Sequence, residues 1–238
     1  MTSTQDVAAA LRAWPQQVRA ITPLAGGWNS GTWLVQTADG RYVAKAVDDL
    51  DSEDFRNGLR LAEFAAAREL SCGAPARASS GQLTVPVSGG TLGLLRHVPG
   101  TPPDLSVPDQ ARRAGRTLAR AHRTLRDFPV GHEPRYRWLW EWVPRCLASI
   151  AMPPEIAAAA RSGWDQVVAA VDDHHLEISL INGDPGPDSF LLNDAGPRLD
   201  ALIDWSTALR GPLHPRRTVA DRQRRRPGAG LPRPDSDR

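Results

Sequence analysis

Cysteines and long apolar runs are scarce in this 238-residue chain. Its two cysteines, Cys72 and Cys146, lie far apart and outside any cysteine–histidine cluster, which excludes a disulfide framework and a cysteine-rich zinc site. No stretch approaches the roughly 18 apolar residues of a membrane-spanning helix, so we expect no membrane partner. The first residues do not form a basic segment followed by an apolar one, so we expect no signal peptide and a cytoplasmic protein.

Lysine is scarcer still, because only Lys45 among the 29 lysine and arginine residues is a lysine. Arginine is a planar fork and lysine a compact point charge, so the two are not interchangeable at a tight phosphate site. Lys45 is therefore either a chance survivor in an arginine-rich composition or a residue whose site requires its shape.

The net charge of +2 conceals an uneven distribution. Residues 213–238 contain eight arginines, three aspartates and four prolines, so this segment carries +5 and the rest of the chain −3. It has too few apolar residues to offset the entropy lost on ordering, and we expect a disordered basic tail. Its run Arg224-Arg225-Arg226 would suit nucleic acid, but no recognition motif accompanies it and the body is acidic, so we expect no nucleic-acid partner.

Apolar spacing divides the rest of the chain into a strand-rich first part and a helix-rich second part. The stretch Pro99-Gly100-Thr101-Pro102-Pro103 breaks regular structure, and we place the boundary between two lobes there. Expected helices cover 5–14, 53–70, 109–126, 137–150 and 154–172, and expected strands lie within 21–47 and at 82–87, 91–98, 177–181, 189–193 and 199–203.

A glycine-rich turn, Gly26-Gly27-Trp28-Asn29-Ser30-Gly31, joins two expected strands. Small residues let backbone amides approach a phosphate closely, although many hairpins contain such glycines. Lys45 lies on the following strand, from which a lysine can reach nucleotide phosphates. Glu63 on the next helix, with Glu69 as the alternative, could hold Lys45 by an ion pair, although a helix glutamate is more often a solvated surface residue.

Two aspartates each follow a short apolar strand in the second part. Asp184 lies in a proline- and glycine-rich loop, and Asp204, twenty residues later, follows a second short apolar strand. Two carboxylates on loops between short strands suit one general base and one Mg²⁺ ligand, although aspartates in such turns also simply cap strand ends.

Together these segments resemble the aminoglycoside phosphotransferase and choline kinase-like family, whose fold is that of the eukaryotic protein kinases. Residues 182–189 match the family's catalytic loop H-G-D-x-x-x-x-N, and residues 203–212 match its metal loop I-D-[FW]-x-x-A-x-x-G-[DP] nearly completely. Residues 118–122 resemble its L-A-x-L-H helix, and residues 94–100 resemble its hinge. The resemblance covers 20–212.

The resemblance implies an α+β, two-lobed protein kinase-like fold, with a small antiparallel-sheet lobe over 1–96 and a mainly helical, incomplete catalytic lobe over 97–212. It implies a monomeric, ATP-dependent phosphotransferase that moves the γ-phosphate to a hydroxyl of a small molecule, aminoglycoside-like or another alcohol. Asp184 would be the catalytic base, and Asp204, Ser189 and Asp188 would hold Mg²⁺. The nucleotide-binding residues would be Gly26, Gly27, Asn29, Ser30, Gly31, Lys45, Glu63, Arg96, His97 and Val98.

The sequence departs from the family pattern at three places. Asn182 stands at the family's histidine, a structural position where we expect tolerance. Ser189 stands at the asparagine that usually binds a second Mg²⁺, so either Asp188 compensates or the loop binds one metal. The tail 213–238 replaces a helical segment of the substrate lobe and resembles an out-of-frame read of GC-rich DNA. These departures leave open a pseudokinase-like nucleotide-binding or interaction module without turnover.

Overall fold

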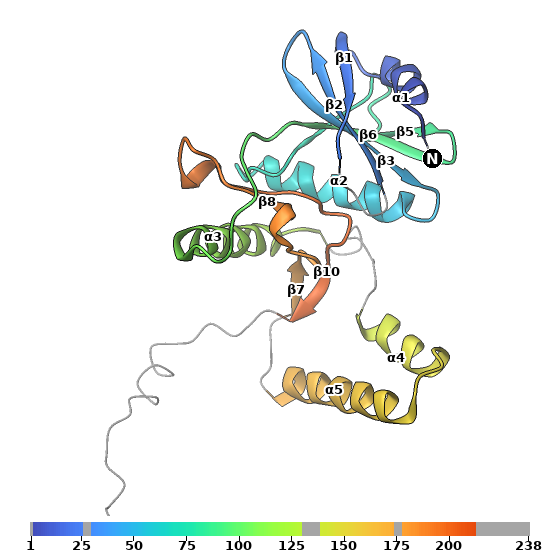
Figure 1. Ribbon diagram of the computed structural model, residues 1–238, viewed down its shortest axis with the longest axis vertical. Coiled ribbons are helices and arrows are strands. Elements are labelled where there is room, and N and C mark those ends of the chain that lie inside the picture. Colours follow the sequence, from blue (N-terminus) through green and yellow to red (C-terminus); the bar gives the residue numbers. More distant parts are fainter. Residues whose placement is uncertain (1, 26–29, 130–138, 174–177, 213–238) are drawn as a thin grey trace, which may run out of the picture.

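The computed structural model describes residues 2–25, 30–129, 139–173 and 178–212. These residues form an α+β structure with an antiparallel sheet at one end and most of the helices toward the other (Figure 1). The predicted basic tail lies outside the described residues. Within the described ranges, no helix combines the length and hydropathy that a membrane span requires.

Six strands of the described residues form the main sheet, and every neighbouring pair is antiparallel. Along β2 and β3, buried side chains alternate with less buried ones, and the buried apolar members pack against α1 (Thr4–Ala10) in one core. The strand order is β1 (Val18–Pro23), β2 (Ser30–Thr37), β3 (Arg41–Asp48), β6 (Gly90–Arg96) and β4 (Pro75–Ala76), with β5 (Thr84–Val87) also pairing with β6.

Helix α2 (Ser52–Ala66) lies between the sheet and the rest of the molecule (Figure 1). Phe55 and Leu59 pack toward Gly93 of β6, where a Cβ would lie 2.9 Å from the Phe55 ring. The helix ends earlier than the predicted 53–70, because Glu69 adopts a left-handed φ of 61° and the Leu70 amide donates to the Ala65 carbonyl oxygen. These are the features of a Schellman C-cap, here formed without glycine.

The second part contains a long helix and two short ribbons. Helix α3 (Pro108–Leu125) packs against β7 (Ile178–Ile181), which pairs with β10 (Leu209–Pro212). Between them in the sequence, β8 (Phe190–Leu191) pairs with β9 (Ala201–Leu202). The loops after β7 and after β9 are therefore brought together by strand pairing.

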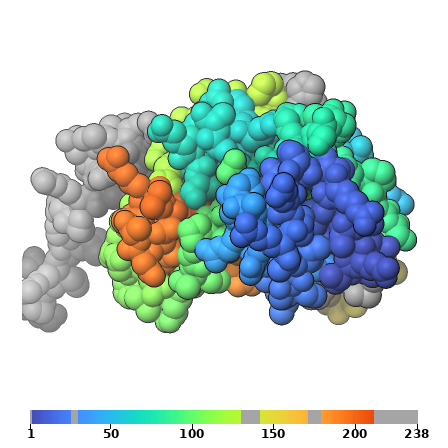
Figure 2. Space-filling view, turned by 90° about the horizontal axis from the view of Figure 1, so that it is seen from above, coloured from blue at the N-terminus to red at the C-terminus, as the bar shows by residue number. Residues whose placement is uncertain are grey.

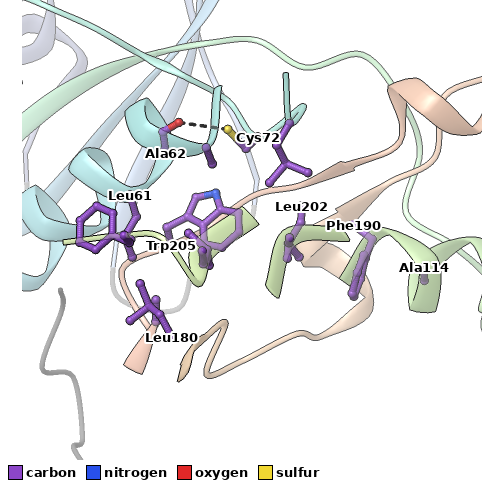
Figure 3. Close-up of a cluster of buried hydrophobic side chains, with 14 residues drawn as sticks. Leu61, Ala62, Cys72, Ala114, Leu180, Phe190, Leu202 and Trp205 are labelled. Carbon is purple, nitrogen blue, oxygen red and sulfur yellow. Dashed lines mark hydrogen bonds between the residues drawn. The ribbon is translucent and has the colours of Figure 1, made fainter. Parts of the chain in front are cut away.

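A second core joins α2, α3 and these ribbons. Trp205 lies beneath α2, and Leu202 and Phe190 extend the cluster toward α3 (Figure 3). Cys72 joins the cluster from the α2 side, where its thiol donates to the Ala62 carbonyl oxygen at 3.2 Å. Burial raises the pKa of the Cys72 thiol to about 12, so this cysteine is an apolar core residue at neutral pH.

Helices α4 (Leu139–Ser149) and α5 (Pro154–Asp173) pack on each other at the far end of the molecule from the sheet (Figure 1). Seen from above in Figure 2, the blue N-terminal strands and the orange residues near 200 lie on either side of green residues near 100. Large apolar side chains remain exposed on α4, on α5 and between them, namely Trp142, Ile150, Ile156 and Val167.

Candidate functional site

A cavity of about 600 Å³ lies between the sheet, α2 and the loop after β9. Its size is that of a small-molecule or cofactor pocket. Apolar walls come from both parts of the chain, including Val43, Leu95, Leu191 and Ile203. Eight of the residues predicted for the site line this cavity: Ser30, Lys45, Arg96, His97, Val98, Asp188, Ser189 and Asp204.

Lys45 and Asp204 form an ion pair in this cavity. The Lys45 Nζ donates to Asp204 Oδ1 at 2.9 Å across 159 residues of sequence. The Lys45 side chain is only 14% exposed, whereas 47% of the Asp204 side-chain surface stays open. Asp204 also has a left-handed φ of 61°, a strained conformation that for non-glycine residues is concentrated at functional sites.

The Asp204 carboxylate is held in its ionised form. Desolvation acts to raise its pKa, but the charge and hydrogen bond of Lys45 and the hydrogen bonds of Ser206 outweigh that effect and lower the pKa. The Ser206 hydroxyl donates to Asp204 Oδ1 at 2.9 Å. Among the described side chains, none donates a hydrogen bond to Oδ2, and almost half of the Asp204 side chain is exposed, so a cation can reach this carboxylate.

Asn182 connects the loop of Asp184 to the loop of Asp204. Its side-chain amide donates to the Asp204 carbonyl oxygen at 3.2 Å, and its Oδ1 accepts from the Asp184 amide at 3.0 Å. The residue is only 3% exposed. From the sequence we expected that a residue other than histidine is tolerated at this position. In the structure, both polar atoms of the Asn182 side chain form hydrogen bonds to the two loops.

Asp184 itself is exposed and does not line the cavity. Its backbone is held at both ends, because its amide donates to Asn182 and its carbonyl oxygen accepts from the Ser189 hydroxyl at 3.2 Å. The side chain is thus presented on a constrained loop beside the cavity.

Sequence comparison identifies the family of this site. The sequence model of the phosphotransferase enzyme family matches residues 20–214. The chain belongs to this family. The match spans the glycine-rich turn, Lys45, the hinge and both carboxylate loops, as the motifs had indicated.

Individual relatives agree with this assignment. Homoserine kinase of Methylobacterium radiotolerans is 27% identical over 188 residues, which is 76% of this chain and 57% of that enzyme. The chain therefore spans little more than half the length of that relative.

Solved kinase structures share the fold of this phosphotransferase-family chain. The amicoumacin kinase hAmiN, in complex with AMP-PNP, Ca²⁺ and Ami, has a TM-score of 0.65 at 15% identity, covering 88% of this chain and 66% of that one. An aminoglycoside phosphotransferase from Alicyclobacillus acidocaldarius has a TM-score of 0.57 at 17% identity, covering 86% and 67%. These similarities confirm the predicted α+β, two-lobed protein kinase-like fold.

The predicted ion pair between Lys45 and Glu63 was wrong. Glu63 accepts two hydrogen bonds from Arg77, one from Nε at 2.7 Å and one from Nη2 at 2.6 Å, and Asp204 takes its place beside Lys45. Helix α2 turns about 100° per residue, so Ala62 faces the cavity while Glu63 points past it. The alternative, Glu69, caps the end of α2 and is not the partner of Lys45 either.

We expect Glu63→Ala to leave nucleotide affinity unchanged and to lower the free energy of unfolding by at most about 1 kcal/mol, as for other exposed ion pairs. Its side chain and that of Arg77 are 39% and 51% exposed, so solvent screens the pair. Urea unfolding and nucleotide titration measure the two quantities. A tenfold loss of nucleotide affinity would contradict this and show that Glu63 contributes to nucleotide binding.

The predicted hinge, Arg96 to Val98, offers a ligand fewer free backbone amides than the sequence suggested. The Arg96 amide donates to the Ala74 carbonyl oxygen, and the His97 amide donates to that of Arg41. The Val98 amide has no hydrogen-bond partner in the described part of the chain. Among these three amides, Val98 is therefore the donor left for a ligand.

The glycine-rich turn is described only at its end. Ser30 lines the cavity, but Gly31 does not. A Cβ on Gly31 would lie 2.5 Å from the Trp33 ring, so core packing alone explains this glycine. Gly26, Gly27 and Asn29 lie outside the described residues.

His122 contacts the loop of Asp184 from α3. Its Nε2 accepts a hydrogen bond from the Asn182 amide at 3.3 Å, which requires a neutral ring. Burial lowers the pKa of His122 below the usual 6.5.

Because the folded-state pKa of His122 is lowered, the unfolded chain binds more protons below about pH 6.5. We therefore expect the free energy of unfolding to fall as the pH drops from 7 toward 5. His122→Gln, which keeps an acceptor without a titrating ring, should flatten this dependence. His97→Gln should flatten the dependence as well, because burial also lowers the pKa of His97, but it leaves the hydrogen bond between Asn182 and His122 in place. Urea midpoints measured across this range test the prediction, and an unchanged slope in His122→Gln would contradict it.

Proposed function

We propose that this chain binds Mg²⁺-ATP in the cavity and transfers the γ-phosphate to a hydroxyl group of a small molecule. The observation that supports this most strongly is the 2.9 Å contact between Lys45 and Asp204, in a member of the phosphotransferase enzyme family. It places the lysine that suits phosphates against the carboxylate that suits a metal. In this proposal, residues 1–96 form the nucleotide-binding lobe and residues 97–212 carry the carboxylates.

The cavity walls suit a nucleotide base and its phosphates. Val43 and Leu95 supply apolar surface from the sheet, and Ile203 supplies it from the opposite side. The Val98 amide would donate to the base. Ser30, together with the sequence-predicted turn residues Gly26, Gly27 and Asn29, would lie near the phosphates, where short side chains leave room for backbone donors.

The donor set also suits Mg²⁺. This ion commonly binds one or two protein carboxylates and takes its other ligands from water and phosphate oxygens. Asp204 offers its half-exposed carboxylate, and Asp188 lines the same cavity. Bound Mg²⁺ would neutralise charge on the phosphates, while Lys45 would share its hydrogen bonds between Asp204 and a phosphate oxygen.

Asp184 would accept the proton of the attacking hydroxyl group at its carboxylate. Asn182 and Ser189 orient the backbone of this residue and leave its side chain exposed to an incoming alcohol. Homoserine and aminoglycosides are the acceptors to test first, because the relatives are a homoserine kinase and an aminoglycoside phosphotransferase.

Two assays on the purified chain test the proposal. Tryptophan fluorescence follows ATP binding with and without Mg²⁺, and mass spectrometry detects a phosphorylated acceptor. We expect Mg²⁺-dependent binding and acceptor phosphorylation. Absence of nucleotide binding under both conditions would overturn the proposal.

Ser189 favours a second candidate, a nucleotide-binding module without turnover. Its side chain is shorter than that of the family's metal-binding asparagine, and its hydroxyl is held at the Asp184 carbonyl oxygen, so it reaches a metal less well. Mg²⁺-dependent ATP binding without any phosphorylated acceptor would support this alternative over the kinase.

A further inference from the structure

Gly58 stands in the middle of α2, where glycine destabilises a helix relative to alanine. A Cβ at this position would lie 2.7 Å from the Ser206 amide nitrogen and 2.8 Å from the Trp205 carbonyl carbon. Both are backbone atoms, which cannot rotate away as a flexible side chain can. The helix and the Asp204 loop therefore contact each other backbone to backbone.

The atoms that Gly58 contacts belong to the two residues that follow Asp204. The Trp205 side chain is buried beneath α2 (Figure 3), and the Ser206 hydroxyl bonds to the Asp204 carboxylate. From the other side, a Cβ on Gly183 would collide with the Thr207 carbonyl oxygen. The loop is thus held between two glycines, one on α2 and one beside Asp184.

A neighbouring face of α2 packs on the sheet. Phe55 and Leu59 fill the space over Gly93 of β6, and Gly93 is the register partner of Lys45 on β3. Helix α2 therefore contacts both the sheet that carries Lys45 and the loop that carries Asp204. Its position between them helps to set the separation between Lys45 and Asp204.

We infer that Gly58 is a positioning residue that sets the place of Asp204 opposite Lys45 and so the geometry of the metal–phosphate site. The effect of Gly58 on the metal–phosphate site rests on the proposed function. The contact between Gly58 and the Asp204 loop is independent of that function. A side chain at position 58 would push residues 205 and 206 away from α2 and move the Asp204 carboxylate with them.

Gly58→Ala and Gly115→Ala make a matched pair, because both change glycine to alanine inside a helix. A Cβ on Gly115 meets no atom within 4 Å, so this control gains helix propensity without a clash. Hydrogen exchange of residues 203–208 reports on the loop, whose Ile203 and Ala208 amides donate to Ser189 and Trp205. We expect exchange there to rise about tenfold in Gly58→Ala and to stay unchanged in Gly115→Ala.

Nucleotide titration provides the functional readout. In Gly58→Ala, we expect the affinity gained on adding Mg²⁺ to fall about tenfold, with little change in the affinity measured without Mg²⁺. In an Asp204→Asn background, Gly58→Ala should cause no further loss of this Mg²⁺ effect, because the ligand that it positions is already gone. A further loss there would indicate a general structural effect and overturn the inference.

These experiments distinguish a failure of the proposed function from a failure of the positioning role of Gly58. If the wild-type chain binds no nucleotide, the proposed function is overturned. The comparison of hydrogen exchange in the two alanine variants still tests the role of Gly58. Equal exchange over 203–208 in both alanine variants overturns the role of Gly58, whatever the nucleotide result. If Gly58→Ala does not fold, Phe55→Leu loosens the same helix from Gly93, and unchanged exchange over 203–208 in that variant overturns the inference.

Discussion

Asp184→Asn is expected to lower kcat by about 10²- to 10⁴-fold, the usual contribution of a general base. Asparagine keeps the size of the side chain but cannot take a proton from an attacking hydroxyl group. The loop should stay in place, because its hydrogen bonds to Asn182 and Ser189 use the backbone of residue 184. Steady-state kinetics with the acceptor found in the phosphorylation assay measure the loss.

Mg²⁺-dependent nucleotide affinity should survive in Asp184→Asn, because Asp184 does not line the cavity. Asp194→Asn is the matched control, since it neutralises another exposed loop aspartate of the same part of the chain. We expect that control to retain wild-type kcat. A loss of less than tenfold in Asp184→Asn would show that another group accepts the proton.

Lys45→Met is expected to weaken nucleotide binding and to lower kcat by about 100-fold or more, as when one preorganised donor is removed from a charged transition state. The variant removes the point charge from the phosphates and leaves Asp204 without its counter-charge. Desolvation would then be opposed only by the hydrogen bonds of Ser206, so the pKa of Asp204 would rise from its value in the wild-type protein.

The change in the pKa of Asp204 should also alter how Mg²⁺-dependent nucleotide binding depends on pH. A lowered pKa means that the ionised carboxylate persists to more acidic pH, so wild-type Mg²⁺-dependent binding should fall only well into the acidic range. In Lys45→Met, the fall should begin at higher pH. Lys45→Arg should keep the wild-type pH dependence yet also lose kcat, because a planar guanidinium cannot occupy the place of a compact ammonium. Nucleotide titrations between pH 4 and 8 test this, and equal pH dependence in all three proteins would contradict it.

Local sequence patterns were enough to reveal much of this protein. The apolar spacing of 109–126 predicted α3 to within a residue at each end, and the β-branched and aromatic residues within 21–47 predicted β2 and β3. The loops of Asp184 and Asp204 were recognisable because a catalytic loop needs particular residues at short, fixed spacings. These features depend on neighbours in the chain, and the sequence contains all the information they require.

Contacts between distant segments could not be obtained in this way. Lys45 pairs with a residue 159 positions away rather than with Glu63, because the rotation of α2 against the sheet determines which of its side chains reach the cavity. The two-residue β4 and the short β10 exist through pairing with β6 and β7 and carry little pattern of their own. Nothing in the sequence distinguishes Gly58 from other helix glycines, and its contact with the loop of Asp204 appears only in the structure. A close backbone approach depends on both partners at once, so it becomes visible only when the two segments are placed together in space.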